Sequence, residues 1–232
     1  TIFAGGAFTN IGGQSRNRIA ALSVTTGSAS SWNPNANSQI QALALVGDTL
    51  YAGGQFTSIS GVTRNRIAAV STATASAFTW NPNANNQVTA IALGNGVLYA
   101  GGQFTTIGGQ TRNRLAALDA ASGLASTWNP NANNTVQSML ARGDTIYVGG
   151  DFTTVGGQPR SRIVALSAAT GAVMAWNPTA FGSVSALAYS EGQVLVGGAF
   201  TAIGGVRRTN LAAYDLATGQ VTSWDPGPNN QV

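Results

Sequence analysis

Short apolar runs alternate with polar turns along the whole chain, and this order of runs and turns returns every 48 residues. The runs are rich in Val, Ile, Leu, Ala and aromatic residues, and they are bounded by Gly, Asn, Ser and Pro. Such segments are typical of strands, and no window has the sustained period of a helix. The pattern predicts four short strands per copy, which in the third copy lie at 97–107, 114–119, 124–128 and 136–141.

A Gly-Gly pair and a tryptophan mark each copy. In the third copy Gly101-Gly102 stands inside the first predicted strand, which indicates a bulge or a close approach of two backbones. The 48-residue step has no insertion or deletion, so each copy is expected to pack against its neighbours through the same contacts. We therefore predict one domain over 1–232, with repeats at 1–48, 49–96, 97–144, 145–192 and, in part, 193–232.

Four strands in about 40 to 50 residues is the size of a β-propeller blade. The sequence therefore predicts an all-β propeller of four-stranded blades with five 48-residue repeats visible. A parallel β-helix is the alternative, although its coils are shorter and lack repeated hairpins. The last repeat stops before the equivalent of 41–48, so the first or last blade is expected to be incomplete. More chain, another molecule or a three-stranded first blade would each explain this. A five-bladed ring and a larger ring of six to eight blades both stay open.

The repeat resembles the kelch-like bacterial family called delta-60, whose members are expected to be β-propellers. The resemblance covers nearly the whole chain, although Asp225 and Asn210 depart from the pattern. It implies a large secreted or surface-attached protein, and it implies no common activity. The residues that carry it in the third copy are Tyr99, Gly101, Gly102, Phe104, Gly108, Gly109, Arg112, Arg114, Trp128, Asn129 and Pro130.

The composition argues against catalysis. The chain has no Cys and no His, and its eleven basic residues are all Arg, so the usual nucleophile, general base and transition-metal ligands are absent. Seven acids are scattered, and none occupies the same position in all five copies, which disfavours a repeated carboxylate pair. We therefore predict no enzyme, no cofactor and no metal site, with a calcium ion held by loop carbonyls and Asn side chains left open.

The charge also limits the partners. Eleven arginines against seven acids give a net charge of +4, but charged residues make up only 8% of the chain and the longest basic run is Arg207-Arg208. The high isoelectric point therefore reflects scarce acids, and no nucleic-acid partner is expected. No apolar stretch reaches the roughly 20 residues of a membrane span, so none is predicted.

Aromatic and amide side chains form one set of candidate ligand-binding residues. A tryptophan at one position per blade is typical of a wedge between blades, but a ring of sugar-stacking platforms is the alternative. The asparagine loop beside it offers donors and acceptors for sugar hydroxyls. The residues in question are Trp32, Trp80, Trp128, Trp176, Trp224, Asn35, Asn83 and Asn131.

Arginines form the second set. Alternation along a strand would place both arginines of a pair on one face, from which they would donate to carbonyls of turns, including those of the neighbouring blade. An anion or acidic-glycan site repeated on one rim is the alternative. The first arginine of the pair is Arg16, Arg64, Arg112, Arg160 or Arg208, and the second is Arg18, Arg66, Arg114 or Arg162.

From these features the predicted function is a non-catalytic scaffold or adhesion module, located outside the cell or on its surface. Two alternatives remain, which are a lectin with one site per blade and a structural subunit of an extracellular filament or surface layer. The expected partners are glycans, other copies of the chain or the rest of a larger chain.

Overall fold

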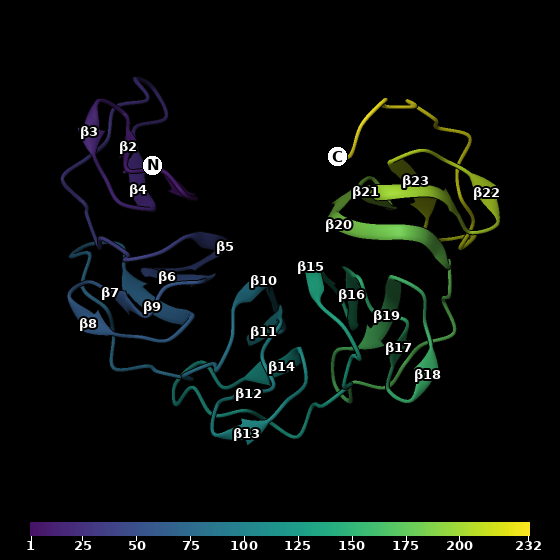
Figure 1. The fold of residues 1–232 in the computed structure, drawn as a ribbon, viewed down its shortest axis with the longest axis horizontal. Helices are drawn as coiled ribbons and strands as arrows, with labels where there is room; N and C mark the ends of the chain where they lie inside the picture. Colours follow the sequence, from purple (N-terminus) through teal and green to yellow (C-terminus); the bar gives the residue numbers. More distant parts are fainter.

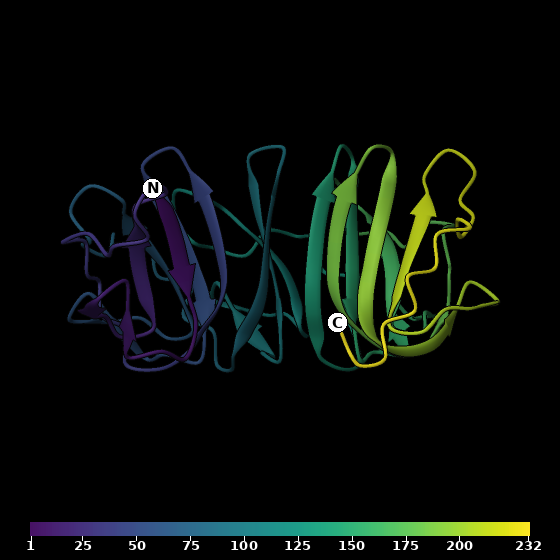
Figure 2. The ribbon, with the colours of Figure 1, turned by 90° about the horizontal axis from the view of Figure 1, so that it is seen from above.

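Five antiparallel sheets, blades 1 to 5, stand side by side around an arc in the computed structural model, which describes residues 1–232 (Figure 1). Seen at right angles, the strands of every blade run in the same general direction through the thickness of the arc (Figure 2). The two termini lie on opposite sides of the opening of the arc. The predicted all-β propeller fold is confirmed, and no helix that could cross a membrane is present.

Each blade is built from the same kinds of strand. Inner strands face the interior of the arc; they are β5 (Ile40–Val46), β10 (Val88–Gly94), β15 (Val136–Arg142) and β20 (Ala180–Ser190). The second strands are β1 (Ile2–Gly5), β6 (Thr49–Gly54), β11 (Val97–Gly102), β16 (Thr145–Gly150) and β21 (Gln193–Ile203). The third strands are β4 (Ile19–Leu22), β9 (Ile67–Ser71), β14 (Leu115–Leu118), β19 (Ile163–Ser167) and β23 (Leu211–Asp215).

Two-residue strands form a small hairpin between the second and third strand of each blade. The apolar member packs inward, and a Gly-Gly or Ser-Gly turn joins the two. These strands are β2 (Asn10–Ile11), β3 (Gln14–Ser15), β7 (Ser58–Ile59), β8 (Val62–Thr63), β12 (Thr106–Ile107), β13 (Gln110–Thr111), β17 (Thr154–Val155), β18 (Gln158–Pro159) and, paired with the long β21, β22 (Val206–Arg207).

The strand order explains how the repeats are joined. In blade 3, β10 pairs with β11 and β11 pairs with β14, all antiparallel. The inner strand β10 lies at the end of one sequence repeat, and β11 begins the next repeat, so every inner strand ties two repeats together. In blade 1, β1 pairs with β4 and no inner strand pairs with it.

The fourth strand is shorter than the sequence predicts. Residues 124–128 form no strand, and only the bridge between Leu118 and Ala125 remains of it. The chain follows the sheet as far as Ser126, whose N–H bonds Ala117 O at 2.9 Å, and then turns so that Trp128 enters the space between blades. The tryptophan wedge and a longer edge strand therefore compete for the same residues.

The Gly-Gly pair marks a close backbone approach, as predicted. A Cβ atom placed on Gly101 would lie 2.5 Å from Val136 Cγ1 of the next blade. A Cβ atom on Gly102 would lie 2.2 Å from Gln87 O, next to the inner strand of the same blade. The bulge itself lies in the facing strand β10. Glycine is therefore required because two neighbours approach β11 at this point.

The core lies between the blades rather than within them. Each apolar cluster joins side chains of two neighbouring blades, as where Trp80 and Tyr51 pack with Leu98 and Phe104. Aromatic pairs at the junctions meet edge to face, a favourable arrangement, with ring centroids 5.0 to 5.3 Å apart. These pairs are Phe3 with Trp32, Tyr51 with Trp80, Tyr99 with Trp128 and Tyr147 with Trp176.

The junction of blades 4 and 5 differs from the others at Tyr214, which stands where the preceding blades have Leu166 and Leu118. Its ring lies 5.2 Å from that of Trp176. The Tyr214 hydroxyl and Trp176 Nε1 are both buried and have no hydrogen-bond partner. Burial without a partner destabilises a polar group, so this junction carries a local cost that the other junctions lack.

We expect Tyr214→Phe to leave the free energy of unfolding at neutral pH unchanged or to raise it by about 1 kcal/mol, because a buried hydroxyl without a partner is removed. Burial raises the pKa of Tyr214, so ionisation favours the unfolded chain once the pH exceeds about 10. The wild type should therefore lose stability above that pH more steeply than the variant. Urea unfolding at pH 7 and at several alkaline pH values measures both effects.

Tyr99→Phe is the matched control, since the Tyr99 hydroxyl donates to Ala168 O at 2.9 Å. Loss of this hydrogen bond should lower the free energy of unfolding at neutral pH by about 1 kcal/mol. Equal destabilisation by the two substitutions would contradict the assignment of Tyr214 as an unpartnered hydroxyl.

Candidate functional site

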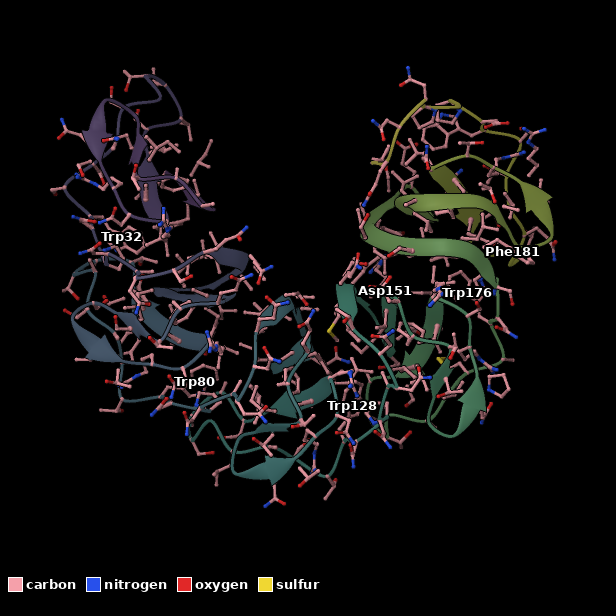
Figure 3. All side chains as sticks on the ribbon, in the orientation of Figure 1. Trp32, Trp80, Trp128, Asp151, Trp176 and Phe181 are labelled. Atoms are coloured by element: carbon pink, nitrogen blue, oxygen red, sulfur yellow. The ribbon has the colours of Figure 1, made fainter.

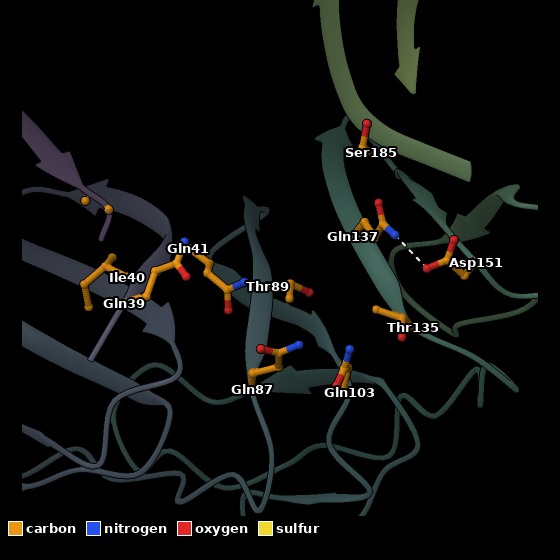
Figure 4. A pocket seen from close by; sticks show the side chains of 12 residues that line it. Gln39, Ile40, Gln41, Gln87, Thr89, Gln103, Thr135, Gln137, Asp151 and Ser185 are labelled. Atoms are coloured by element: carbon orange, nitrogen blue, oxygen red, sulfur yellow. Dashed lines mark hydrogen bonds between the residues drawn. The ribbon is translucent and has the colours of Figure 1, made fainter. Parts of the chain in front are cut away.

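A polar cavity of about 540 Å³ lies on the inner wall, the surface that the inner strands of blades 2 to 5 turn toward the interior of the arc (Figure 4). Ile40 is the only large apolar residue in its lining. No aromatic residue and none of the arginines lines it. The polar side chains around it are those of Gln39, Gln41, Gln87, Thr89, Gln103, Thr135, Gln137, Asp151 and Ser185.

The repeat places these side chains in register. Alternation along β15 buries Val136 and Ser138 and turns Gln137 toward the cavity. Equivalent positions of the other blades do the same, so polar residues spaced 48 apart form rows across the wall. One row is Gln41, Thr89, Gln137 and Ser185; the second is Gln39, Gln87, Thr135 and Ser183; the third, which follows the Gly-Gly pairs, is Gln55, Gln103 and Asp151.

Hydrogen bonds connect the rows between neighbouring blades. Gln55 Nε2 donates to Gln87 Oε1 at 2.8 Å. At the equivalent position two blades further on, the Ser183 hydroxyl donates to Asp151 Oδ1 at 2.7 Å. Gln137 Nε2 donates to Asp151 Oδ2 at 2.6 Å, as drawn in Figure 4. The wall is therefore pre-ordered by its own side chains.

Asp151 is the one charged side chain in the lining. Arg162 bonds the backbone carbonyl of Asp151, and its guanidinium forms no ion pair with the carboxylate. The only ion pair in the molecule joins Arg208 and Asp225 at 3.6 Å. The Asp151 carboxylate is half-buried and held by two neutral donors, so its negative charge is not matched by a cation of the protein.

Sequence reasoning did not single out this wall. Asp151 looked like one of seven scattered acids. Four of the glutamines lie at the starts of inner strands and two follow Gly-Gly pairs, all of them in short polar stretches. Their 48-residue spacing was the pattern that could have identified them, once the first residues of each inner strand were assigned to the interior of the arc.

The tryptophans lie between blades, where Figure 3 shows four of them along the arc. Trp32, Trp80 and Trp128 are buried, and each indole N–H donates to a carbonyl of the next blade at 2.9 to 3.0 Å. Trp176 is half-buried at the altered junction, and Trp224 is 45% exposed. The buried indoles present no free face, so sugar binding at these positions stays a prediction and the wedge has the structural support.

The loop asparagines are exposed and have positive φ. Asn35 Oδ1 accepts from Asn17 Nδ2 at 2.8 Å, and Asn83 Oδ1 accepts from Asn65 Nδ2 at 2.7 Å, while Asn131 has no such bond. Two residues further along, Asn85 Oδ1 accepts the backbone N–H groups of Thr105 and Thr106 in the next blade. Asn37 and Asn133 repeat this arrangement. The loop is thus fastened to the neighbouring blade, and a ligand role for it stays a prediction.

The first arginine of each pair is half-buried and donates to two backbone carbonyls. Arg112 reaches Thr111 O at 2.7 Å and Ser126 O at 2.6 Å, both in its own blade. The same two bonds recur in every repeat, for Arg16, Arg64, Arg160 and Arg208. The predicted donation to turn carbonyls is present, but for this set it stays within the blade. No row of unpaired guanidiniums forms on a rim.

The predicted placement of both arginines on one face of a strand is wrong. Arg114 has φ of 66° and lies just outside β14, because the chain makes a left-handed turn there. Its Nη1 donates to Ala132 O at 3.1 Å. Asn210 stands at this place in blade 5, with φ of 63°, and its bond to Pro228 O at 3.2 Å is equivalent to that of Arg114. The other second arginines, Arg18, Arg66 and Arg162, donate instead to the carbonyl that follows the Gly-Gly pair of their own blade.

Arg112→Lys should lower the free energy of unfolding by about 1 to 3 kcal/mol, since an ammonium cannot reproduce two bonds made by a planar fork. Chemical denaturation monitored by tryptophan fluorescence measures the change. Arg207→Lys is the control: Arg207 is exposed and its side chain makes no hydrogen bond, so a change within about 0.5 kcal/mol is expected. Equal effects of the two substitutions would argue against the carbonyl contacts.

The turn acids have a local backbone role. The hydroxyl and the backbone N–H of Ser122 hold the pKa of Asp119 below its usual value. The backbone N–H and hydroxyl of Thr218 do the same for the pKa of Asp215. No three carboxylates gather at one place in the chain.

Comparison with known proteins places the chain among repeat propellers. The family model described as outer membrane protein assembly factor BamB matches residues 9–177 and, in a second alignment, residues 63–227. No curated protein matches the chain.

Solved structures that resemble the chain share its fold at low sequence identity. The computationally designed Ika8 protein is 15% identical with a TM-score of 0.60, over 92% of this chain and 57% of its own. The WD40 repeats of RRP9 are 13% identical with a TM-score of 0.60, over 88% of this chain and 55% of that chain. The extracellular domain of BT4673 from B. thetaiotaomicron is 18% identical with a TM-score of 0.55, over 84% and 24%. The chain thus spans little more than half of the first and second of these and a quarter of the third.

Proposed function

This chain belongs to the family described as outer membrane protein assembly factor BamB, and we propose that it serves as a non-catalytic binding module whose ligand contacts the inner wall. The observation that carries the proposal is the polar cavity of about 540 Å³. Gln41, Thr89, Gln137 and Ser185 lie on inner strands, and each of the other polar side chains directly adjoins a strand, so a ligand there contacts the sheets and not the long loops.

The lining does not suit catalysis. Asp151 is the only ionisable side chain of the cavity, so no acid and base pair faces a shared point. The hydroxyls of Thr89 and Ser185 donate to backbone carbonyls, and no histidine or lysine is present to activate them. What the wall offers is hydrogen bonding and one negative charge.

Nuclear magnetic resonance of the glutamine side-chain amides tests the binding module. The probes are a set of neutral tri- to pentasaccharides and a set of acidic, neutral and basic tetrapeptides. We expect at least one class to shift the amide signals of Gln41, Gln87, Gln103 or Gln137 and to leave those of the outer asparagines in place. Absence of any shift at the inner wall, or shifts confined to the outer rim, would overturn the proposal.

A lectin with sites on the rim is the second candidate, favoured by grooves at equivalent places of two junctions. One groove of about 410 Å³ is lined by Asn81, Asn83, Gly109 and Leu124. Another of about 370 Å³ is formed by the equivalent residues two blades further on. A glycan array read with Asn83→Ala and Gln87→Ala separates the two functions, because the first change alters the groove and the second alters the inner wall.

Location outside the cell or on its surface, and membership in the delta-60 repeats, complete the proposal. The low charge and the absence of Cys and Lys support an exposed location. Assembly with other copies into a filament stays a prediction, which light scattering at high protein concentration tests.

A further inference from the structure

We propose that the inner wall has a specific site for a protonated primary amine, centred on Asp151 between blades 4 and 5. This inference rests on the proposed function, since it names the ligand chemistry of the same cavity. Figure 3 places Asp151 at the inner side of these two blades, and Figure 4 shows Gln137 bonded to it and Ser185 on the neighbouring strand β20, on the far side of Gln137.

The lining of the cavity has one charged side chain, that of Asp151, and no side chain of opposite charge. A cavity lined by neutral groups and one carboxylate has a net negative charge, and the protein supplies no ion-pair partner for it. Nine of the eleven arginines donate to backbone carbonyls. Arg162 is one of them: it bonds the backbone carbonyl of Asp151 and forms no ion pair with the carboxylate, so the carboxylate can still take a cationic ligand.

Asp151, Gln137 and Ser185 each have an oxygen that can accept a further hydrogen bond. Each Asp151 oxygen accepts one bond from the protein, from Ser183 or from Gln137, and a carboxylate oxygen has room for another. Because Gln137 points its N–H at Asp151, its carbonyl oxygen stays available, and Figure 4 shows that oxygen turned away from the carboxylate. The Ser185 hydroxyl donates to Val232 O and can still accept. An ammonium group has three donors, and the free acceptor positions of the Asp151 carboxylate can take one or more of them.

Other ligand classes fit less well. Calcium takes six to eight oxygen ligands, usually with several carboxylates, and the cavity has a single carboxylate. An anion would meet Asp151 and no cation. A neutral sugar would find no aromatic face to stack on, because no aromatic residue lines the cavity. A protonated amine is the class that pairs with the one charge of the lining and can bond the free acceptor positions beside it.

The repeat supplies an internal control for the carboxylate. Gln55 and Gln103 occupy the equivalent positions, and Gln55 donates to Gln87 of the next blade where Asp151 accepts from Ser183. Asp151→Gln therefore installs the residue that the repeat itself uses, which keeps a bond between blades and removes the charge. In the opposite direction, Gln103→Asp places a carboxylate next to Thr135, the equivalent of Ser183.

The experiment titrates the full chain with cadaverine, a linear diamine with a primary amine at each end, and follows the side-chain amide of Gln137 by nuclear magnetic resonance. We expect saturable binding to the wild type that weakens as salt is added. Asp151→Gln should weaken binding at least tenfold at an unchanged unfolding midpoint, and Gln103→Asp should add a second site. Two further pairs of probes identify the source of the amine: Nα-acetyl-lysine methylamide against its Nε-acetyl form, and glucosamine against N-acetylglucosamine.

Binding that requires a free amine and the Asp151 carboxylate supports the site, and the preferred probe pair tells a lysine side chain from an amino sugar. No binding of cadaverine to the wild type, or equal binding by Asp151→Gln, overturns it. If neutral probes shift the glutamines of the wall while cadaverine binds neither protein, or binds wild type and variant equally well, the amine site is wrong and the binding module stands. If no probe shifts the wall at all, both fail.

Discussion

Gly102→Ala is expected to lower the free energy of unfolding by about 3 kcal/mol or more, which is at the upper end of overpacking effects. A single added Cβ would lie 2.2 Å from Gln87 O and 3.0 Å from Val88 Cα. Both neighbours are backbone atoms of the inner strand, so no side-chain rotation relieves the contact. The φ of Gly102 is not in the left-handed region, so the cost comes from the contact and not from the conformation.

Gly109→Ala is the matched control. Gly109 has φ of 74°, and a Cβ atom there would meet nothing within 4 Å. Gly109→Ala should lower the free energy of unfolding by about 1 to 2 kcal/mol, the usual penalty for an alanine in the left-handed region. Guanidinium unfolding compares the two variants. A smaller loss for Gly102→Ala than for Gly109→Ala would contradict the close approach of β10 and β11.

Hydrogen exchange can show which blades Gly102→Ala destabilises. Each blade contacts only its neighbours, so the free energy of a repeat protein is close to a sum of local terms and nearest-neighbour terms. Hydrogen exchange of Gly102→Ala should therefore show lower protection first in blade 3 and at its two junctions. The equivalent glycines Gly54, Gly150 and Gly198 meet a backbone carbonyl at 2.1 to 2.2 Å, which indicates the same response in the other blades.

The fold could be predicted from the sequence because the same sequence features, with the same physical consequences, recur in each of the five repeats. The Gly-Gly pairs and the tryptophan spacing lie where they were expected. Local alternation could not predict the left-handed φ of Arg114, because that turn depends on a bond between Arg114 N–H and Phe104 O. Nor could it predict that the edge strand gives way to the tryptophan wedge.

The candidate site was harder to predict, because its meaning depends on position in the arc. Asp151 stands alone in the sequence, and its partner Ser183 is 32 residues away in another blade. Gln137 belongs to a third segment. Only the arrangement of strands around the arc brings these residues together, and polarity alone does not separate a wall residue such as Gln137 from a residue of the outer hairpin such as Gln110.

Trp128→Ala is expected to lower the free energy of unfolding by about 3 to 5 kcal/mol, the usual range for a large buried aromatic. The side chain is 3% exposed, packs against Tyr99 and donates to Ser167 O at 3.0 Å. Its removal opens a cavity between blades 3 and 4 and leaves a carbonyl of blade 4 without that donor. The same change at Trp224, which is 45% exposed, should cost no more than about 1 kcal/mol.

Trp128→Phe divides the effect into packing and hydrogen bonding. Phenylalanine keeps an aromatic ring beside Tyr99 but cannot donate to Ser167 O, so the variant should fall between the wild type and Trp128→Ala. The order of stabilities by chemical denaturation, together with glycan binding of the folded variants, decides between the two roles of the tryptophans. If the tryptophans act as wedges, the free energy of unfolding falls from the wild type to Trp128→Phe and further to Trp128→Ala. If the tryptophans are sugar-stacking platforms, Trp128→Ala should lose glycan binding and keep its free energy of unfolding. That result would identify the tryptophans as ligand-binding residues.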